Sequence, residues 1–144
     1  MNDAFTPLSL ACAAIAVAGM LANFIMVALR YPYLPDRVPR HYGITGKPDG
    51  WSSKRIIWTY PLIPLVALVA MAGVVVSKAG KSGPEELRET LRQISLLSAF
   101  LCVLALVLTL RTFAVAEKRA DGLGRLFLPA FVAGFLILGL LLRK

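Results

Sequence analysis

Acidic side chains are missing from the longest apolar stretches of this sequence, and cysteine and histidine are scarce throughout it. The chain has two cysteines, Cys12 and Cys102, and one histidine, His41. Two cysteines inside apolar stretches support neither a disulfide framework nor a cysteine-rich metal site. Buried carboxylates, lysines and histidines line the pathways of pumps and coupled transporters, so their absence from these stretches argues against such functions.

Hydrophobic residues dominate the rest of the sequence. They make up 58% of the 144 residues and give a mean hydropathy of +0.71, against about 45–50% apolar residues in soluble domains. Four stretches, at about 8–29, 57–77, 94–113 and 123–142, are long enough to cross a hydrocarbon core about 30 Å thick as helices. We therefore predict an all-α, polytopic membrane protein: one domain, 1–144, of four transmembrane helices with a structured loop, 30–56, between the first two.

The first apolar stretch has one feature of a cleaved signal peptide. Ala16-Val17-Ala18 mimics a cleavage site, but the apolar run is too long and Met1-Asn2-Asp3 carries no lysine or arginine. We expect this stretch to remain in the protein as a transmembrane helix.

Small side chains predict how the helices pack. They repeat at four-residue spacing at Ala14, Ala18 and Ala22 in the first stretch and at Ala130 and Gly134 in the fourth. Such faces let helix backbones approach closely, so we expect them inside the bundle. Asn23 is the one amide within the first stretch, and we expect it to hydrogen-bond to a neighbouring helix.

The third helix is predicted to begin well before its apolar core. Ser82-Gly83-Pro84-Glu85-Glu86 combines a capping serine or glycine, a first-turn proline and acidic side chains at the positive end of the helix dipole. Nothing breaks the helix before Ala116, which gives a length of about 50 Å. The extra turns carry Glu85, Arg88, Glu89 and Arg92, spaced for ion pairing on a solvated face. Asp121-Gly122 is expected to turn the chain into the fourth helix.

The 30–56 loop holds most of the remaining information. All four tyrosines and both tryptophans lie in it or near its edge, with six of the nine prolines between positions 32 and 64. An interfacial aromatic belt accounts for Tyr31, Trp58 and Tyr60. The prolines restrict the backbone so strongly that we expect a compact cap on the helix bundle, with a turn at Lys47-Pro48-Asp49-Gly50.

Apolar and polar side chains of this loop predict its two faces. The expected apolar underside consists of Leu34, Val38, Tyr42 and Trp51. The expected polar chemistry comes from Asp36, Arg37, His41, Asp49 and Lys54.

These residues resemble a known family signature. The stretch reads LPDxVPxHYGxxGxPDxWxxK from Leu34 to Lys54. It is similar to the signature of a bacterial membrane domain of unknown function, which also forms the N-terminal part of SdpI-type immunity proteins. Those longer proteins protect a cell from its own secreted toxic peptide and relay the presence of that peptide to a repressor. The resemblance implies a bacterial plasma-membrane protein.

Three hypotheses describe what the loop does. The first is recognition or signalling, in which rigid aromatic and charged side chains bind a peptide, a lipid headgroup or a protein. The second is a metal or catalytic site formed by Asp36, His41 and Asp49, although one histidine and no nucleophile motif argue against an enzyme. The third is purely structural, with these side chains capping turns and pairing with nearby cations.

We favour recognition and predict no catalytic residue, resident metal or cofactor. The candidate binding residues are Pro35, Asp36, Pro39, His41, Tyr42, Gly46, Asp49, Trp51 and Lys54.

The net charge of +8 predicts lipid contact and orientation in the membrane. The charges lie in short segments between apolar stretches, which fits anionic lipid headgroups better than nucleic acid. Ten lysines and arginines fall on the side of the 30–56 loop, counting Arg111 and Arg125, and six fall on the other side. The positive-inside rule therefore predicts that the loop is cytoplasmic and that both termini are outside.

Overall fold

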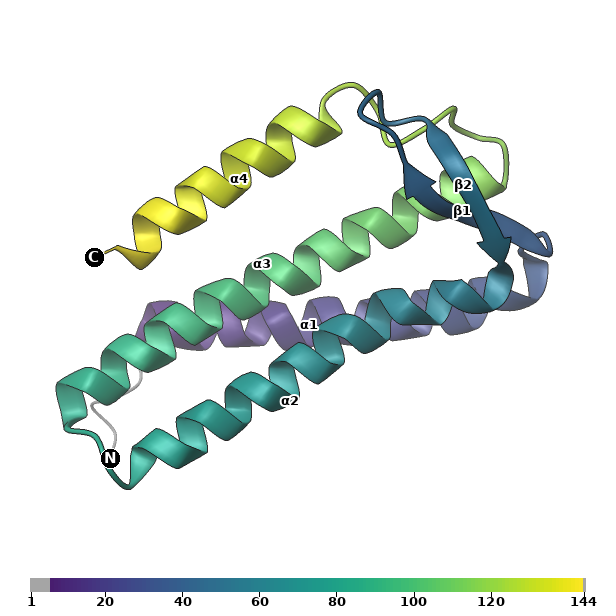
Figure 1. Cartoon of the computed structure of the whole chain (residues 1–144). Coiled ribbons are helices and arrows are strands. Elements are labelled where there is room, and N and C mark those ends of the chain that lie inside the picture. Colours follow the sequence, from purple (N-terminus) through teal and green to yellow (C-terminus); the bar gives the residue numbers. More distant parts are fainter. Residues whose placement is uncertain (1–5, 144) are drawn as a thin grey trace.

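The computed structural model describes residues 6–143, which form four helices and one small hairpin (Figure 1). The helices are α1 (Pro7–Arg30), α2 (Thr59–Ala79), α3 (Pro84–Ala116) and α4 (Phe127–Leu142). Between α1 and α2 lie the 3₁₀ turns η2 (Tyr31–Tyr33) and η3 (Lys54–Trp58), which flank strands β1 (Arg37–Tyr42) and β2 (Pro48–Ser53). The predicted all-α class is thus incomplete, because the structured loop is an antiparallel hairpin.

Three segments are long and apolar enough to cross a membrane: Pro7–Tyr33, Lys54–Ala79 and Pro84–Ala116. Large apolar side chains point outward along these helices; Val66 is 66% exposed and Val76 is 75% exposed. Soluble monomers rarely expose apolar surface on this scale, whereas lipid accommodates it. The helices therefore indicate a multi-pass membrane protein.

The fourth helix is shorter than predicted and begins at Phe127. The expected start at position 123 is wrong, because Leu123 is buried and donates its backbone N–H to the carbonyl of Gly46 in the hairpin (2.9 Å). Gly124 then turns the chain at a φ of +93°. The apolar residue Leu123, which hydropathy places in the fourth transmembrane stretch, therefore contacts the hairpin instead. Helix α4 itself is about 24 Å long.

Helices α1 and α3 form the most extensive helix contact in the structure. The buried face of α1 contains Cys12, Ala16 and Val27, and Gly19 lies against Cys102 of α3. The predicted small-residue face is wrong for α1, since Ala14 and Ala18 are exposed. Small residues form two stripes along α1, one with Ala14 and Ala18 and one with Ala16 and Gly19. Helix α3 packs on the second stripe.

Two other packing predictions have different outcomes. Asn23 is fully buried, but neither of its side-chain polar atoms has a hydrogen-bond partner among residues 6–143, so the predicted interhelical bond is wrong. In α4, Gly134 packs against the Phe100 ring as a small interface residue should, whereas Ala130 is exposed.

Helix α3 has the predicted bounds and the predicted ion pairs. Gly83 caps it in an extended conformation, and Glu89 pairs with Arg92 at 2.6 Å. Arg92 also donates from Nη1 to the carbonyl of Leu141 (2.8 Å). This bond satisfies one of the carbonyls left without an intrahelical partner in the last turn of α4. It also ties the end of α4 to the beginning of α3.

The molecule has two distinct ends (Figure 1). The beginning of α1, the α2–α3 turn and the end of α4 lie at one end. The hairpin and the 117–126 loop lie at the other, where the hairpin crosses the end of α3. Residues far apart in the sequence therefore meet at the hairpin end.

Candidate functional site

The hairpin is closed by a turn at residues 43–47. The Gly43 N–H donates to the Lys47 carbonyl (2.9 Å), and the Gly46 N–H donates to the Gly43 carbonyl (2.8 Å). Gly46 has a φ of +75°, a conformation that favours glycine. The turn predicted at Lys47–Gly50 is wrong, because Pro48, Asp49 and Gly50 belong to β2. Residues 43–47 and 47–50 both have the composition of a turn, and only the register between the strands shows which of them forms it.

The inner face of the hairpin is part of the hydrophobic core. Leu34 is 4% exposed and Val38 is fully buried, as predicted for the underside of the loop. Their cluster includes residues from two helices, α1 and α3, and from η3: Val27, Ile57, Phe113 and Ala116. Each buried aliphatic side chain contributes roughly 1.5–3 kcal/mol, so this contact anchors the hairpin on the bundle.

A chain of hydrogen bonds between side chains fixes the end of β1 that leads into the turn. The Tyr42 hydroxyl donates to Oγ1 of Thr112 in α3 (3.1 Å), and Thr112 donates to the hydroxyl oxygen of Tyr60 in α2 (3.2 Å). Thr112 is fully buried. Burial raises the pKa of the Tyr42 phenol above its ordinary value, so the hydroxyl remains protonated and available as a donor. The sequence gives no sign that Thr112 joins two tyrosines. It predicts Tyr60 only as a member of the interfacial aromatic belt.

The hairpin tip docks on the loop before α4. The Gly46 carbonyl accepts the Leu123 N–H, and Gly122 lies so close that a Cβ at this position would overlap the same carbonyl oxygen. Gly122 is therefore a close-approach glycine as well as part of the predicted Asp121-Gly122 turn.

A backbone hydrogen bond closes the base of the hairpin, next to an exposed ion pair. Lys54 Nζ lies 3.6 Å from Oδ1 of Asp36 and 5.5 Å from the centroid of the Tyr31 ring. The Lys54 N–H donates to the Asp36 carbonyl (2.9 Å), which closes the open end of the strands. Asp36 is largely solvent-exposed, so its ion pair with Lys54 contributes little to stability and forms no closed pocket.

A second charged group lies at the same end, outside the hairpin. Arg30, at the end of α1, donates to Glu117 (2.8 Å), and Arg119 donates to the same carboxylate (2.7 Å). Burial opposes ionisation of this carboxyl, but the bonds from Arg119 and Arg30 outweigh it and lower the pKa of Glu117. Sequence spacing gives no sign of the Arg30–Glu117 contact, because these two residues are 87 positions apart.

The outer face of the hairpin carries an exposed histidine–carboxylate pair. His41 Nδ1 lies 2.6 Å from Oδ1 of Asp49, and both side chains are more than half exposed. Trp51, two residues along β2, is 49% exposed, so its predicted place on the apolar underside is wrong. Alternation along β2 explains this, because Asp49 and Trp51 lie on the same face of the strand.

The predicted site residues therefore separate into three groups. Tyr42 and Gly46 anchor the hairpin, and Pro39 is buried opposite Trp51 in the strand register. Asp36 and Lys54 lie at its base, next to exposed Pro35, and His41, Asp49 and Trp51 form what we call the outer-face cluster. Asp36 is not part of that cluster. Within residues 6–143, no group of three potential metal ligands comes together.

A family comparison agrees with the loop signature. Residues 18–74 match the family described as Domain of unknown function (DUF1648). This segment carries a DUF1648 domain. The match covers the second half of α1, the whole hairpin and most of α2, so the predicted resemblance is confirmed at the level of this domain. No curated protein and no solved structure matches the chain.

Proposed function

We propose that the protein is a recognition module of a bacterial plasma membrane, which binds a peptide or protein partner through the outer-face cluster of its DUF1648 domain. One observation carries this proposal: the hairpin is anchored on its inner face, at its tip and at its base, while His41, Asp49 and Trp51 remain exposed. A rigid surface with an exposed tryptophan offers contact area at little entropic cost.

The outer-face cluster contributes little to holding the hairpin in place. An exposed ion pair contributes about 0–1 kcal/mol, far less than the buried cluster around Val38. His41 and Asp49 are therefore better explained by an interaction with something outside the chain. A non-enzymatic role related to SdpI-type immunity or signalling fits this arrangement, because it needs a binding surface and no nucleophile.

The membrane arrangement belongs to the same proposal. Helix α4 runs back along α3 to the opposite end of the molecule, where Arg92 bonds to Leu141, so we propose α4 as a fourth crossing. The hairpin end then contains the α1–α2 and α3–α4 connections, and its excess of lysine and arginine supports a cytoplasmic position for this end.

Photo-crosslinking in cells tests the recognition proposal. A photoreactive phenylalanine analogue at Trp51 should yield an adduct with one discrete partner. The same analogue at Leu62, which is exposed on α2, should yield no adduct of that size. Adding His41→Ala to the Trp51 probe should reduce the adduct severalfold while the purified protein keeps its thermal stability.

Two results would count against recognition. An adduct of equal yield from both probe positions would reflect random collision in the membrane. An adduct that is unaffected by His41→Ala and by Asp49→Ala would remove the outer-face cluster from the interaction.

A further inference from the structure

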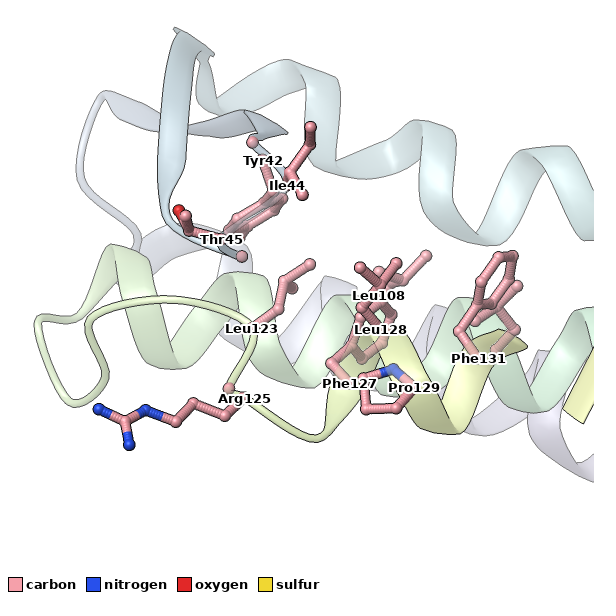
Figure 2. A pocket seen from close by; sticks show the side chains of 14 residues that line it. Tyr42, Ile44, Thr45, Leu108, Leu123, Arg125, Phe127, Leu128, Pro129 and Phe131 are labelled. Carbon is pink, nitrogen blue, oxygen red and sulfur yellow. The ribbon is translucent and has the colours of Figure 1, made fainter. Parts of the chain in front are cut away.

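An apolar groove of about 550 Å³ runs beneath the hairpin tip, between α3 and α4. Tyr42 and Ile44 line it from the hairpin, Leu108 from α3, and Leu128 and Phe131 from α4. In Figure 2 these side chains run from the hairpin end towards Phe131, deeper along the helices. The groove lies between two apolar helices and is lined mainly by apolar side chains, so it suits the acyl chains of a surrounding lipid.

Positive charge is concentrated at the hairpin end of this groove. Arg125 lines the groove, and its guanidinium points away from the apolar side chains (Figure 2). The Arg111 guanidinium lies beside Gly124, with Nη1 3.8 Å from where a Cβ of Gly124 would be. Within residues 6–143, neither guanidinium has a hydrogen-bonding or ion-pairing partner. Unpaired cations at one end of an apolar groove match the charge and shape of an anionic lipid.

A second apolar groove, of about 370 Å³, lies between α2 and α3. Leu104 and Leu108 line both grooves, so they form a ridge on α3 with one groove on each side. Arg40, from β1, lines the second groove. The two grooves share one ridge, and an arginine lines each of them. This arrangement suits the two acyl chains of one phospholipid.

We propose that this surface is a specific site for an anionic phospholipid of the surrounding leaflet. The headgroup phosphate contacts Arg111 and Arg125, and one acyl chain occupies the groove that reaches Phe131. The second chain lies across the Leu104–Leu108 ridge. This site is independent of the outer-face cluster, which lies on the opposite face of the hairpin, so either proposal can fail without the other.

Native mass spectrometry tests this site. The protein is reconstituted in nanodiscs of equimolar phosphatidylglycerol and phosphatidylcholine, transferred to mild detergent, and weighed with the lipids it retains. The wild type should retain one phosphatidylglycerol with roughly tenfold preference over phosphatidylcholine. Each guanidinium near the headgroup should change the binding constant by roughly fivefold, so Arg111→Gln/Arg125→Gln should abolish the preference.

Matched variants separate a site from general electrostatic attraction. Lys81→Gln/Arg143→Gln removes the same charge from the α2–α3 turn and from the residue after α4, at the opposite end of the molecule, and should keep the preference. Arg111→Lys/Arg125→Lys should also keep most of it. Circular dichroism and a monodisperse elution profile check that every variant is folded.

Three results would overturn the proposal. The first is equal retention of the two lipids by the wild type. The second is loss of preference in both glutamine double variants, which would indicate bulk charge only. The third is displacement of the retained lipid by excess inorganic phosphate, since a site that depends on the groove should not yield to a free headgroup analogue.

Discussion

Thr112 in α3 links the hairpin to two helices through its hydroxyl group. It lies about one turn from the end of the apolar helix α3, is fully buried, and joins the hydroxyls of Tyr42 and Tyr60. We expect Thr112→Val to lower the free energy of unfolding by about 1–3 kcal/mol, because it leaves the two tyrosine hydroxyls without their partner. Thermal unfolding in detergent measures this, with Thr112→Ser as the control that keeps the hydroxyl. Equal stability of the valine variant and the wild type would contradict the hydrogen-bonded chain.

Glu117 should make stability depend on acidity. Although burial opposes its ionisation, Arg119 and Arg30 lower the pKa of its carboxyl in the folded protein. The contribution of Glu117 is therefore complete above the ordinary glutamate pKa and is lost as pH falls through the lowered folded value. Glu117→Gln should flatten the acid limb of the stability–pH curve. Glu85→Gln, an equal charge change at the other end, should leave it in place; identical curves for both variants would contradict the assignment.

Some residue-scale predictions could be made from the sequence and others could not. Val38 and Leu34 are correctly predicted as buried because apolar side chains in a loop over a helix bundle have few other places to go. Trp51 is not, because a tryptophan is equally compatible with a core and with a binding surface. The sequence could not predict that the Asn23 amide lacks a hydrogen-bond partner, because this depends on how the neighbouring helices are rotated.

At the scale of elements, the contact between the hairpin tip and the 117–126 loop depends on a glycine. A Cβ on Gly122 would overlap the Gly46 carbonyl, so Gly122→Ala should push the tip away and cost about 1–3 kcal/mol. Gly139→Ala is the matched control: nothing lies within 4 Å of its Cβ position, and alanine suits a helix better than glycine. Thermal unfolding of the two variants compares them, and a Gly122→Ala protein as stable as the control would argue against a docked tip.

The sequence predicts helices better than it predicts their connections. Helix α3 has strong local signals at its beginning and no breaker for 33 residues, so its bounds are correct. The hairpin turn is misplaced because two glycine-containing segments compete, and cross-strand pairing decides between them. The beginning of α4 is misplaced because Leu123 packs against the hairpin rather than lipid, a tertiary effect that hydropathy does not detect.

At the scale of the whole molecule, the two ends should lie on opposite sides of the membrane. In a Cys12→Ala/Cys102→Ala background, a single Ser53→Cys on the exposed hairpin edge should react with a membrane-impermeant maleimide only after lysis. A single Lys81→Cys at the opposite end should react in intact cells. The reverse pattern would place the hairpin outside and overturn the orientation inferred from ten positive charges against six.

The number and order of the apolar helices follow from composition, but their arrangement does not. Hydropathy cannot show that α1 packs mainly on α3, or that α4 diverges enough from the bundle to leave a groove beside α3. In lipid, the apolar outer face and the apolar packing face of a helix have similar composition, so only small residues in contact, such as Gly19 against Cys102, distinguish them.

Both proposals require that residues 36–54 form a folded cap docked on the helix bundle. Hydrogen–deuterium exchange of the protein in nanodiscs tests this requirement most directly. The structure predicts slow exchange at the amides of Gly43, Gly46, Lys54 and Leu123, all of which are hydrogen-bonded across the hairpin or to its tip. Gly122→Ala should raise the exchange rate at Leu123 first. Exchange across the whole 36–54 segment as fast as in an unstructured peptide would contradict the account.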